Sequence, residues 1–275
     1  MPLPSLSFLR GVSSAHRSQV SRFISRRANE VFSRFLSNPT CFRSMIDHTN
    51  SCVSGSAILE IALQSSPVQP WLATDLDVYV PLTAIHTVMT YLADNEGFLA
   101  VFPPQLPPDI AEYGAGIAGV VHMVRPHGVK IDLIVSTRMS SLYPLAYFWG
   151  TCVMNWFKNG QLGFAYPKLT LQGLGLINPD KIRHPKVRAC IDKYTARGFR
   201  LGRFEEGNPF HTDRSLNVGY CPRRFRYFGD RTCLLFNVPD GEAHRLVEDG
   251  LPMMPELKTF WTFGHSDCGN GCGGA

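Results

Sequence analysis

The sequence predicts an α+β fold in which a mixed β-sheet is flanked by helices. Two apolar, β-branched runs indicate strands, at residues 74–81 and 129–135. Segments 57–63 and 83–94 place apolar residues at helical spacing. With 275 residues, 44% of them hydrophobic and 18% charged, the chain is long enough to bury one full core.

The strand predicted at 74–81 carries two acids at alternate positions. Asp75 and Asp77 are two residues apart, so in a strand both side chains point to the same face. The alternating Leu76, Val78 and Val80 point into a core. Carboxylates about 6–7 Å apart at the backbone can share divalent cations. The sequence therefore predicts an acidic site on the outer face of this strand.

The run at 129–135 contains a single acid, Asp132, on the face opposite to Val129, Ile131, Leu133 and Val135. A carboxylate buried without a partner is destabilising, so we expect something to neutralise it. Mg²⁺, a hard cation that takes oxygen ligands, is the simplest candidate. If the two strands are neighbours, Asp132 joins Asp75 and Asp77 in a cluster of three carboxylates.

A third motif lies upstream, where Val53-Ser54-Gly55-Ser56 precedes the helix predicted at 57–63. The free N–H groups and the positive dipole end of a helix N-terminus favour phosphate. With this turn, then Asp-x-Asp on a strand, then a lone Asp on a later strand, residues 40–140 resemble the polymerase-beta-like nucleotidyltransferase superfamily.

The resemblance implies a nucleotidyltransferase-type sheet and Mg²⁺-dependent transfer of a nucleoside monophosphate from a nucleoside triphosphate to a hydroxyl acceptor. It implies that Gly55 and Ser56 hold the β- and γ-phosphates. Asp75, Asp77 and Asp132 would be the catalytic acids, holding two Mg²⁺ or Mn²⁺ ions, with Asp132 helping to withdraw the proton of the attacking hydroxyl.

Two further comparisons bear on the resemblance. The segment 57–74 is longer than expected of the family, and its prolines and Trp71 indicate an inserted loop. Segments 165–171 and 193–199 are similar to uncharacterised fungal proteins that carry this domain.

The alternatives left open are a non-catalytic nucleotide- or nucleic-acid-binding module that retains the fold, and an unrelated structural protein. The acceptor is open among an RNA end, a protein side chain and a small molecule.

Positive charge is concentrated in the segment 181–233, with 13 lysines and arginines against 5 acids. This excess favours a polyanionic partner, a nucleic acid or a nucleoside triphosphate. On the helix predicted at 186–197, Lys193 and Arg197 lie on one face, and we expect them to contact a triphosphate. The alternative is a solvated helical face.

We divide the chain into an N-terminal segment 1–37, a nucleotidyltransferase-like domain 38–200 and a basic C-terminal extension 201–275. The first 29 residues contain no acid and are rich in Arg and Ser. They suit either a mitochondrial transit peptide or an amphipathic helix from Ser18 to Leu36.

Eight scattered cysteines and the lack of any long apolar run predict an intracellular, cytoplasmic protein with no membrane span, the mitochondrion being the alternative.

Three other segments need an interpretation. Gly114–Gly119 matches a dinucleotide-binding pattern, but a strand follows it where a helix is required, so we predict a hairpin of strands at 117–125 and 129–135. Residues 140–157 are predicted to be helical. The tail from His265 to Cys272 offers His and Cys, but without Cys-x-x-Cys, so zinc is not favoured.

Overall fold

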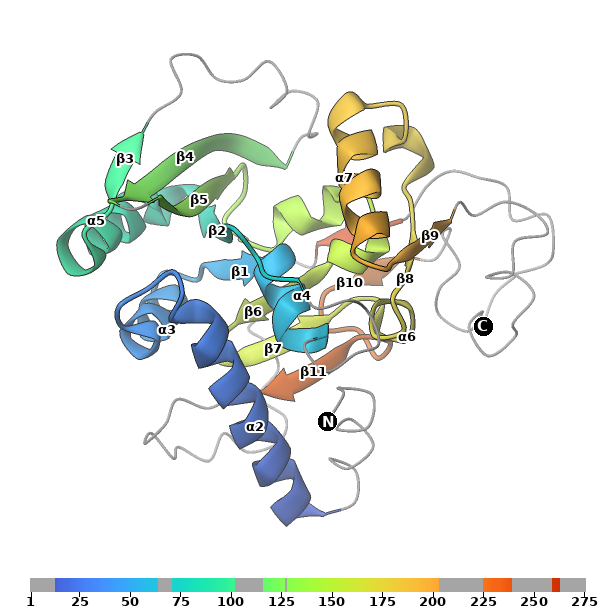
Figure 1. Ribbon diagram of the computed structural model, residues 1–275, viewed down its shortest axis with the longest axis horizontal. Coiled ribbons are helices and arrows are strands. Elements are labelled where there is room, and N and C mark those ends of the chain that lie inside the picture. Colours follow the sequence, from blue (N-terminus) through green and yellow to red (C-terminus); the bar gives the residue numbers. More distant parts are fainter. Residues whose placement is uncertain are drawn as a thin grey trace.

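The computed structural model describes residues 13–63, 71–101, 116–126, 128–202, 225–238 and 259–262. At its centre is an eight-stranded sheet with the strand order β11-β7-β6-β1-β2-β5-β4-β3 (Figure 1). Neighbouring strands run antiparallel except β2 and β5, which are parallel. The predicted α+β class, with a mixed sheet flanked by helices, is confirmed.

The elements have the following bounds. The sheet consists of β1 (Cys52–Ser54), β2 (Leu76–Pro81), β3 (Leu99–Val101), β4 (Ile117–Arg125), β5 (Val129–Ser136), β6 (Asn155–Lys158), β7 (Gln161–Phe164) and β11 (Leu234–Asn237). Two small sheets pair β8 (Leu174–Leu176) with β9 (Arg200–Gly202) and β10 (Arg226–Tyr227) with β12 (Phe260–Trp261). The α-helices are α2 (Ser14–Phe32), α3 (Pro39–His48), α4 (Ser56–Leu63), α5 (Ile85–Glu96), α6 (Pro167–Thr170) and α7 (Pro185–Ala196).

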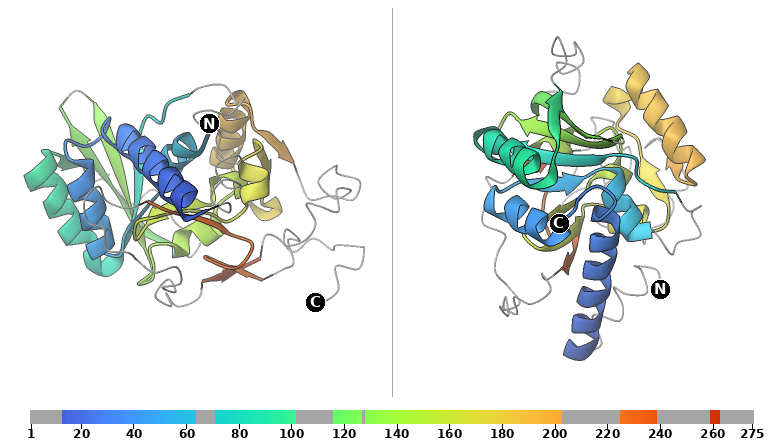
Figure 2. Two further views of the ribbon diagram at one scale, coloured as in Figure 1. Left: turned by 90° about the horizontal axis from the view of Figure 1, so that it is seen from below. Right: turned by 60° about the vertical axis from the view of Figure 1, so that its left-hand side comes forward.

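Different cores cover the two faces of the central strands. Helices α4 and α5 pack directly on the sheet, with α2 and α3 packed against them (Figure 1 and Figure 2). Leu76 and Val78 of β2 belong to this helical core, whereas Tyr79 of β2 and Ile134 of β5 belong to a second core on the opposite face. Because side chains alternate along a strand, Asp77 also points away from the helical core, as predicted.

The hairpin predicted in place of a dinucleotide motif is confirmed, because β4 and β5 pair antiparallel around residues 126–128. The helix predicted at 140–157 is wrong. The segment forms two 3-10 turns, η3 (Tyr143–Tyr147) and η4 (Thr151–Val153), followed by strand β6. Neighbouring Trp156 and Phe157 are buried in opposite cores, which is the alternation of a strand and not of a helix.

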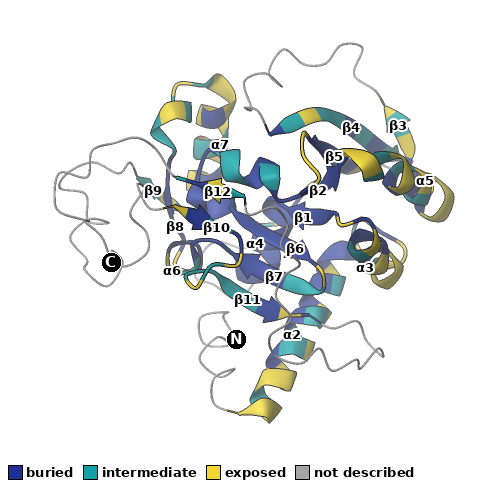
Figure 3. Cartoon of the chain, turned by 180° about the vertical axis from the view of Figure 1, so that it is seen from behind, coloured by how far each residue is buried: buried dark blue, intermediate teal, exposed yellow. Residues whose placement is uncertain are grey.

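The N-terminal amphipathic helix is confirmed, and it spans Ser14–Phe32. Its first turns are exposed, while its later apolar residues are buried in the helical core (Figure 3). Phe32 packs edge-on against Phe42 and Phe157. At the other end of the chain, β11 pairs with β7, so residues 234–237 of the predicted C-terminal extension belong to the central sheet.

Two further expectations concern zinc binding by the tail and membrane-spanning helices. The His/Cys tail at 265–272 lies outside the described residues, so the zinc expectation stays a prediction. Within the part of the chain that the structure describes, no helix is both long enough and apolar enough to cross a membrane.

Candidate active site

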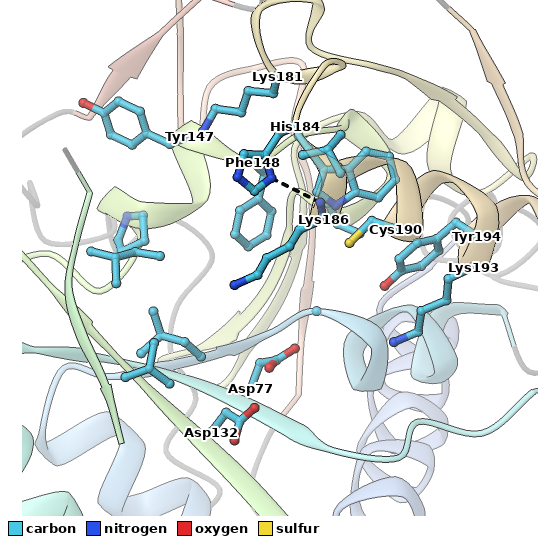
Figure 4. A pocket seen from close by; sticks show the side chains of 18 of the residues that line it. Asp77, Asp132, Tyr147, Phe148, Lys181, His184, Lys186, Cys190, Lys193 and Tyr194 are labelled. Atoms are coloured by element: carbon cyan, nitrogen blue, oxygen red, sulfur yellow. Dashed lines mark hydrogen bonds between the residues drawn. The ribbon is translucent and has the colours of Figure 1, made fainter. Parts of the chain in front are cut away.

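Asp77 and Asp132 lie side by side on parallel neighbouring strands. In the pairing of β2 with β5, Asp77 is the direct partner of Asp132. The same row continues to Ser54 of β1 and to His122 of β4. Figure 4 shows the two acids together on the floor of a pocket. The two acidic strands are therefore neighbours, which was the condition for bringing Asp132 to the acids of the other strand.

Asp132 already has a partner in the protein. Nδ1 of His122 lies 2.7 Å from Oδ1 of Asp132. We did not predict this pair, although the predicted hairpin implies it. A turn at 126–128 places residue 125 opposite residue 129, so three positions farther from the turn residue 122 lies opposite residue 132. His122 therefore supplies Asp132 with a hydrogen-bond partner within the protein. The expectation that Mg²⁺ neutralises this carboxylate stays a prediction.

The turn before α4 lies directly against the Asp77 carboxylate. Gly55 has a φ of +72°, a conformation that favours glycine, and a Cβ at this position would lie 2.1 Å from Oδ2 of Asp77. The Ser56 hydroxyl, buried at the start of α4, lies 3.5 Å from Oδ1 of Asp75. Gly55 and Ser56 are thus brought to the acids, as their predicted role requires.

The acids influence one another electrostatically. Burial, and then the neighbouring Asp75 and Asp132, raise the pKa of Asp77 to about 7, while Lys193 acts in the opposite direction. Crowded carboxylates in a partly buried place suit a hard divalent cation, because it takes oxygen ligands and offsets their repulsion. Among the described residues, no three His, Cys, Asp or Glu side chains lie close enough to enclose a metal ion, so binding would require these side chains to turn.

The pocket above the acids has a volume of about 880 Å³. Its lining includes Gly55 and four aspartates, which are Asp75, Asp77, Asp132 and Asp180. Helix α7 and the turn before it supply the basic wall, which consists of Lys181, Arg183, His184, Lys186 and Lys193 (Figure 4). An apolar wall consists of Tyr79, Ile117, Val120, Ile134, Pro144, Tyr147, Phe148 and Trp149. Acids, cations and apolar groups thus line one pocket of the size of a small-molecule site.

The two cations predicted to contact a triphosphate lie in different places. Lys193 lines the pocket and is close enough to influence Asp77. Arg197, at the end of α7, is not among the lining residues; its guanidinium lies 4.0 Å from the centre of the Trp71 ring. Lys186, near the start of the same helix, reaches into the pocket (Figure 4). Residues 203–224 of the basic segment lie outside the described residues.

The raised pKa of Asp77 predicts how stability depends on pH in the absence of divalent cations. Between its ordinary value of 3.8 and about 7, the folded protein holds a proton that the unfolded chain has lost. Rising pH therefore favours unfolding across this window, and the loss is complete above it. We expect the wild type to lose on the order of 2–4 kcal/mol relative to Asp77→Asn.

Urea unfolding with EDTA at a series of pH values between 4 and 8 measures this difference. The exposed Asp94 on α5 provides a matched control, since Asp94→Asn removes a carboxylate that is not among the pocket residues. A constant difference between wild type and Asp77→Asn across the whole range would contradict the electrostatic description of the site.

No protein-family model matches the sequence, and no curated protein matches it. Among solved structures, one described as "The complex structure of CCA-adding enzyme with CTP" is similar, with a TM-score of 0.48 and 13% sequence identity. The match covers 66% of this chain and 43% of that one, so it spans less than half of that structure's length. A similarity this distant carries no argument, and the function proposed below rests on the residues of the site.

Proposed function

We propose that this chain is a divalent-cation-dependent nucleotidyltransferase, which moves a nucleoside monophosphate from a nucleoside triphosphate to a hydroxyl acceptor and releases pyrophosphate. The observation that carries the proposal is the row of residues across the sheet. Asp77 and Asp132 are direct strand partners, and the same pocket is lined by Gly55 at the start of α4 and by Lys193. Carboxylates that can bind cations and cationic groups that can bind phosphates therefore line the same pocket.

The chain's own groups have distinct tasks in this reaction. The backbone at Gly55 and the hydroxyl of Ser56 hold the β- and γ-phosphates at the N-terminus of α4, and Lys193 neutralises phosphate charge. Asp132 receives the proton of the attacking hydroxyl at its carboxylate. Two Mg²⁺ or Mn²⁺ ions held by Asp75, Asp77 and Asp132 would supply stabilisation of the negative charge on the attacking and leaving oxygens.

We expect Lys193→Ala to weaken the binding of a nucleoside triphosphate by about 1–2 kcal/mol, a factor of about 5–30. The reason is the loss of one charge-assisted contact at an exposed side chain, so the effect should shrink as salt is added. Titration calorimetry with a non-hydrolysable triphosphate and Mg²⁺ measures it.

Arg188→Ala is the matched control, because Arg188 lies on the same helix, is exposed and is not among the pocket residues. It removes one positive charge without touching the site. Equal weakening by both variants would assign the effect to the overall charge of α7 and not to a contact made by Lys193.

A screen of labelled nucleoside triphosphates with Mg²⁺ or Mn²⁺ tests the reaction itself. Pooled RNA, protein and metabolite acceptors are offered to the wild type and to Asp132→Asn. We expect label to pass to one acceptor class with the wild type only. Triphosphate binding without transfer to any pool would instead favour the alternative of a non-catalytic binding module that retains the fold.

We also propose that the basic segment 181–233 binds a nucleic acid. Its support is that Lys181, Arg183 and Lys186, which begin the segment, line the pocket beside the aromatic rings of Tyr147 and Phe148. Both rings are partly buried, and cations next to aromatic rings that line a pocket suit a single-stranded end. Transfer of label to the RNA pool in the screen would bear it out.

A further inference from the structure

His122 extends the row of acids by one strand. It is the partner of Asp132 across β4 and β5, just as Asp77 is the partner of Asp132 across β2 and β5. Its side chain lines the pocket and is 44% exposed, against 25% for Asp132. The row runs from Ser54, next to Gly55, to His122, so His122 lies at the end farther from the turn that would hold phosphates.

The contact between the two side chains has a defined direction. A carboxylate only accepts hydrogen bonds, so the ring nitrogen Nδ1 of His122 carries the proton and donates it to Oδ1 of Asp132 over 2.7 Å. One oxygen of Asp132 is thereby engaged. The other, Oδ2, is the oxygen that Asp132 can offer to a cation or to a hydroxyl group.

We propose that His122 is a positioning residue for Asp132. It holds the carboxylate so that Oδ2 is presented to the cation and to the acceptor hydroxyl. This proposal rests on the nucleotidyltransferase function proposed above. Hydrogen-bond partners of metal-binding groups generally contribute a factor of about 10–100 to metal affinity or activity, because they orient the ligand.

The first test compares three substitutions by their Mn²⁺ affinity, measured by electron paramagnetic resonance in the presence of a non-hydrolysable triphosphate. His122→Ala removes the hydrogen bond. His122→Asn keeps a donor nitrogen at the same number of bonds from the backbone as Nδ1, whereas His122→Gln places it one bond farther out. We expect affinity to fall about 10–100-fold for Ala and Gln and to be largely restored for Asn.

Two controls separate positioning from folding. His86→Ala removes a histidine that is exposed on α5 and is not among the pocket residues, and it should leave Mn²⁺ affinity unchanged. Thermal melts of all variants report the fold. A fall in affinity that follows the melting temperature in all three His122 variants would make His122 a structural residue and would overturn the proposal.

The second test observes the hydrogen bond itself. Nitrogen NMR of ¹⁵N-histidine-labelled protein, with His122→Ala to assign the signals, should show a proton on Nδ1 of His122. A ring without a proton on Nδ1 would overturn the proposal whatever the cation measurement gives.

The outcomes also distinguish this proposal from the one it rests on. If the wild type binds Mn²⁺ in a manner that Asp132→Asn abolishes, and His122→Ala binds it equally well, only the positioning role fails. If the wild type shows no binding that depends on Asp132, the proposed cation site fails, and the role of His122 fails with it.

Discussion

Asp77→Asn is expected to lower nucleotidyl transfer on the order of 10³-fold while leaving the fold intact. Asp77 is central to the row of acids, with Asp132 as its strand partner and Gly55 against its carboxylate. An amide has nearly the same shape but no charge, so it cannot replace a carboxylate in holding a cation. Transfer of labelled nucleotide, measured beside a thermal melt, gives both results.

The stability of this variant is as informative as its activity. Because burial and neighbouring acids raise the pKa of Asp77, its removal should stabilise the cation-free protein above pH 7. Asp94→Asn is the control for the loss of one exposed carboxylate. Retained transfer in Asp77→Asn would remove this residue from the mechanism, and a collapse of the fold would contradict the description of Asp77 as a functional group.

Gly55→Ala is expected to reduce transfer on the order of 10²–10³-fold at a modest cost in stability. The positive φ of Gly55 disfavours alanine, and the new Cβ would lie 2.1 Å from Oδ2 of Asp77. A side-chain oxygen can rotate away, so the carboxylate should move and the fold should persist. The cost of the backbone conformation alone is about 1–2 kcal/mol, while the lost placement of Asp77 affects the reaction.

Gly97 provides an unusually close control for this substitution. Its φ of +70° matches that of Gly55, but nothing lies within 4 Å of where its Cβ would be. Gly97→Ala should therefore show a similar loss of stability and wild-type transfer. If Gly55→Ala also retained wild-type transfer, the contact between the α4 turn and Asp77 would have no functional meaning.

Much of the site could be predicted because its residues lie on strands with clear alternation. Asp77 and Asp132 are acids in largely apolar runs, and alternation alone places both away from the helical core. The sequence left open whether the two strands are direct neighbours, because membership of one sheet does not determine which strands are adjacent, and the structure shows that they pair. The roles of Asp75, Asp77, Asp132, Gly55 and Ser56 in catalysis stay predictions.

Two parts of the site were missed for different reasons. The pairing of His122 with Asp132 follows from a hairpin turn at 126–128, and it was overlooked because His122 is a single histidine in an apolar strand. Lys193 and Arg197 share a helical face, but the angle at which α7 lies over the sheet brings only Lys193 into the pocket. Helical periodicity gives the face of a helix and not which of its turns meets the site.

The helix predicted at 140–157 shows a different limit. Aromatic and apolar residues are so frequent in this segment that both the helical period of 3.6 residues and the strand period of two residues fit the sequence. Periodicity then cannot distinguish a buried strand from a buried helix. In the structure, residues 155–158 form strand β6, which pairs with β1 on one side and with β7 on the other. Trp156 and Phe157 thereby stabilise two cores instead of one.

The most direct test of the central claim is the number of Mn²⁺ ions bound per chain in the presence of a non-hydrolysable nucleoside triphosphate. Electron paramagnetic resonance of free Mn²⁺ measures it without knowledge of the acceptor. We predict up to two bound ions for the wild type and a loss of tight binding when Asp77 and Asp132 are both replaced by Asn. The same binding in the wild type and in this double variant would contradict the account.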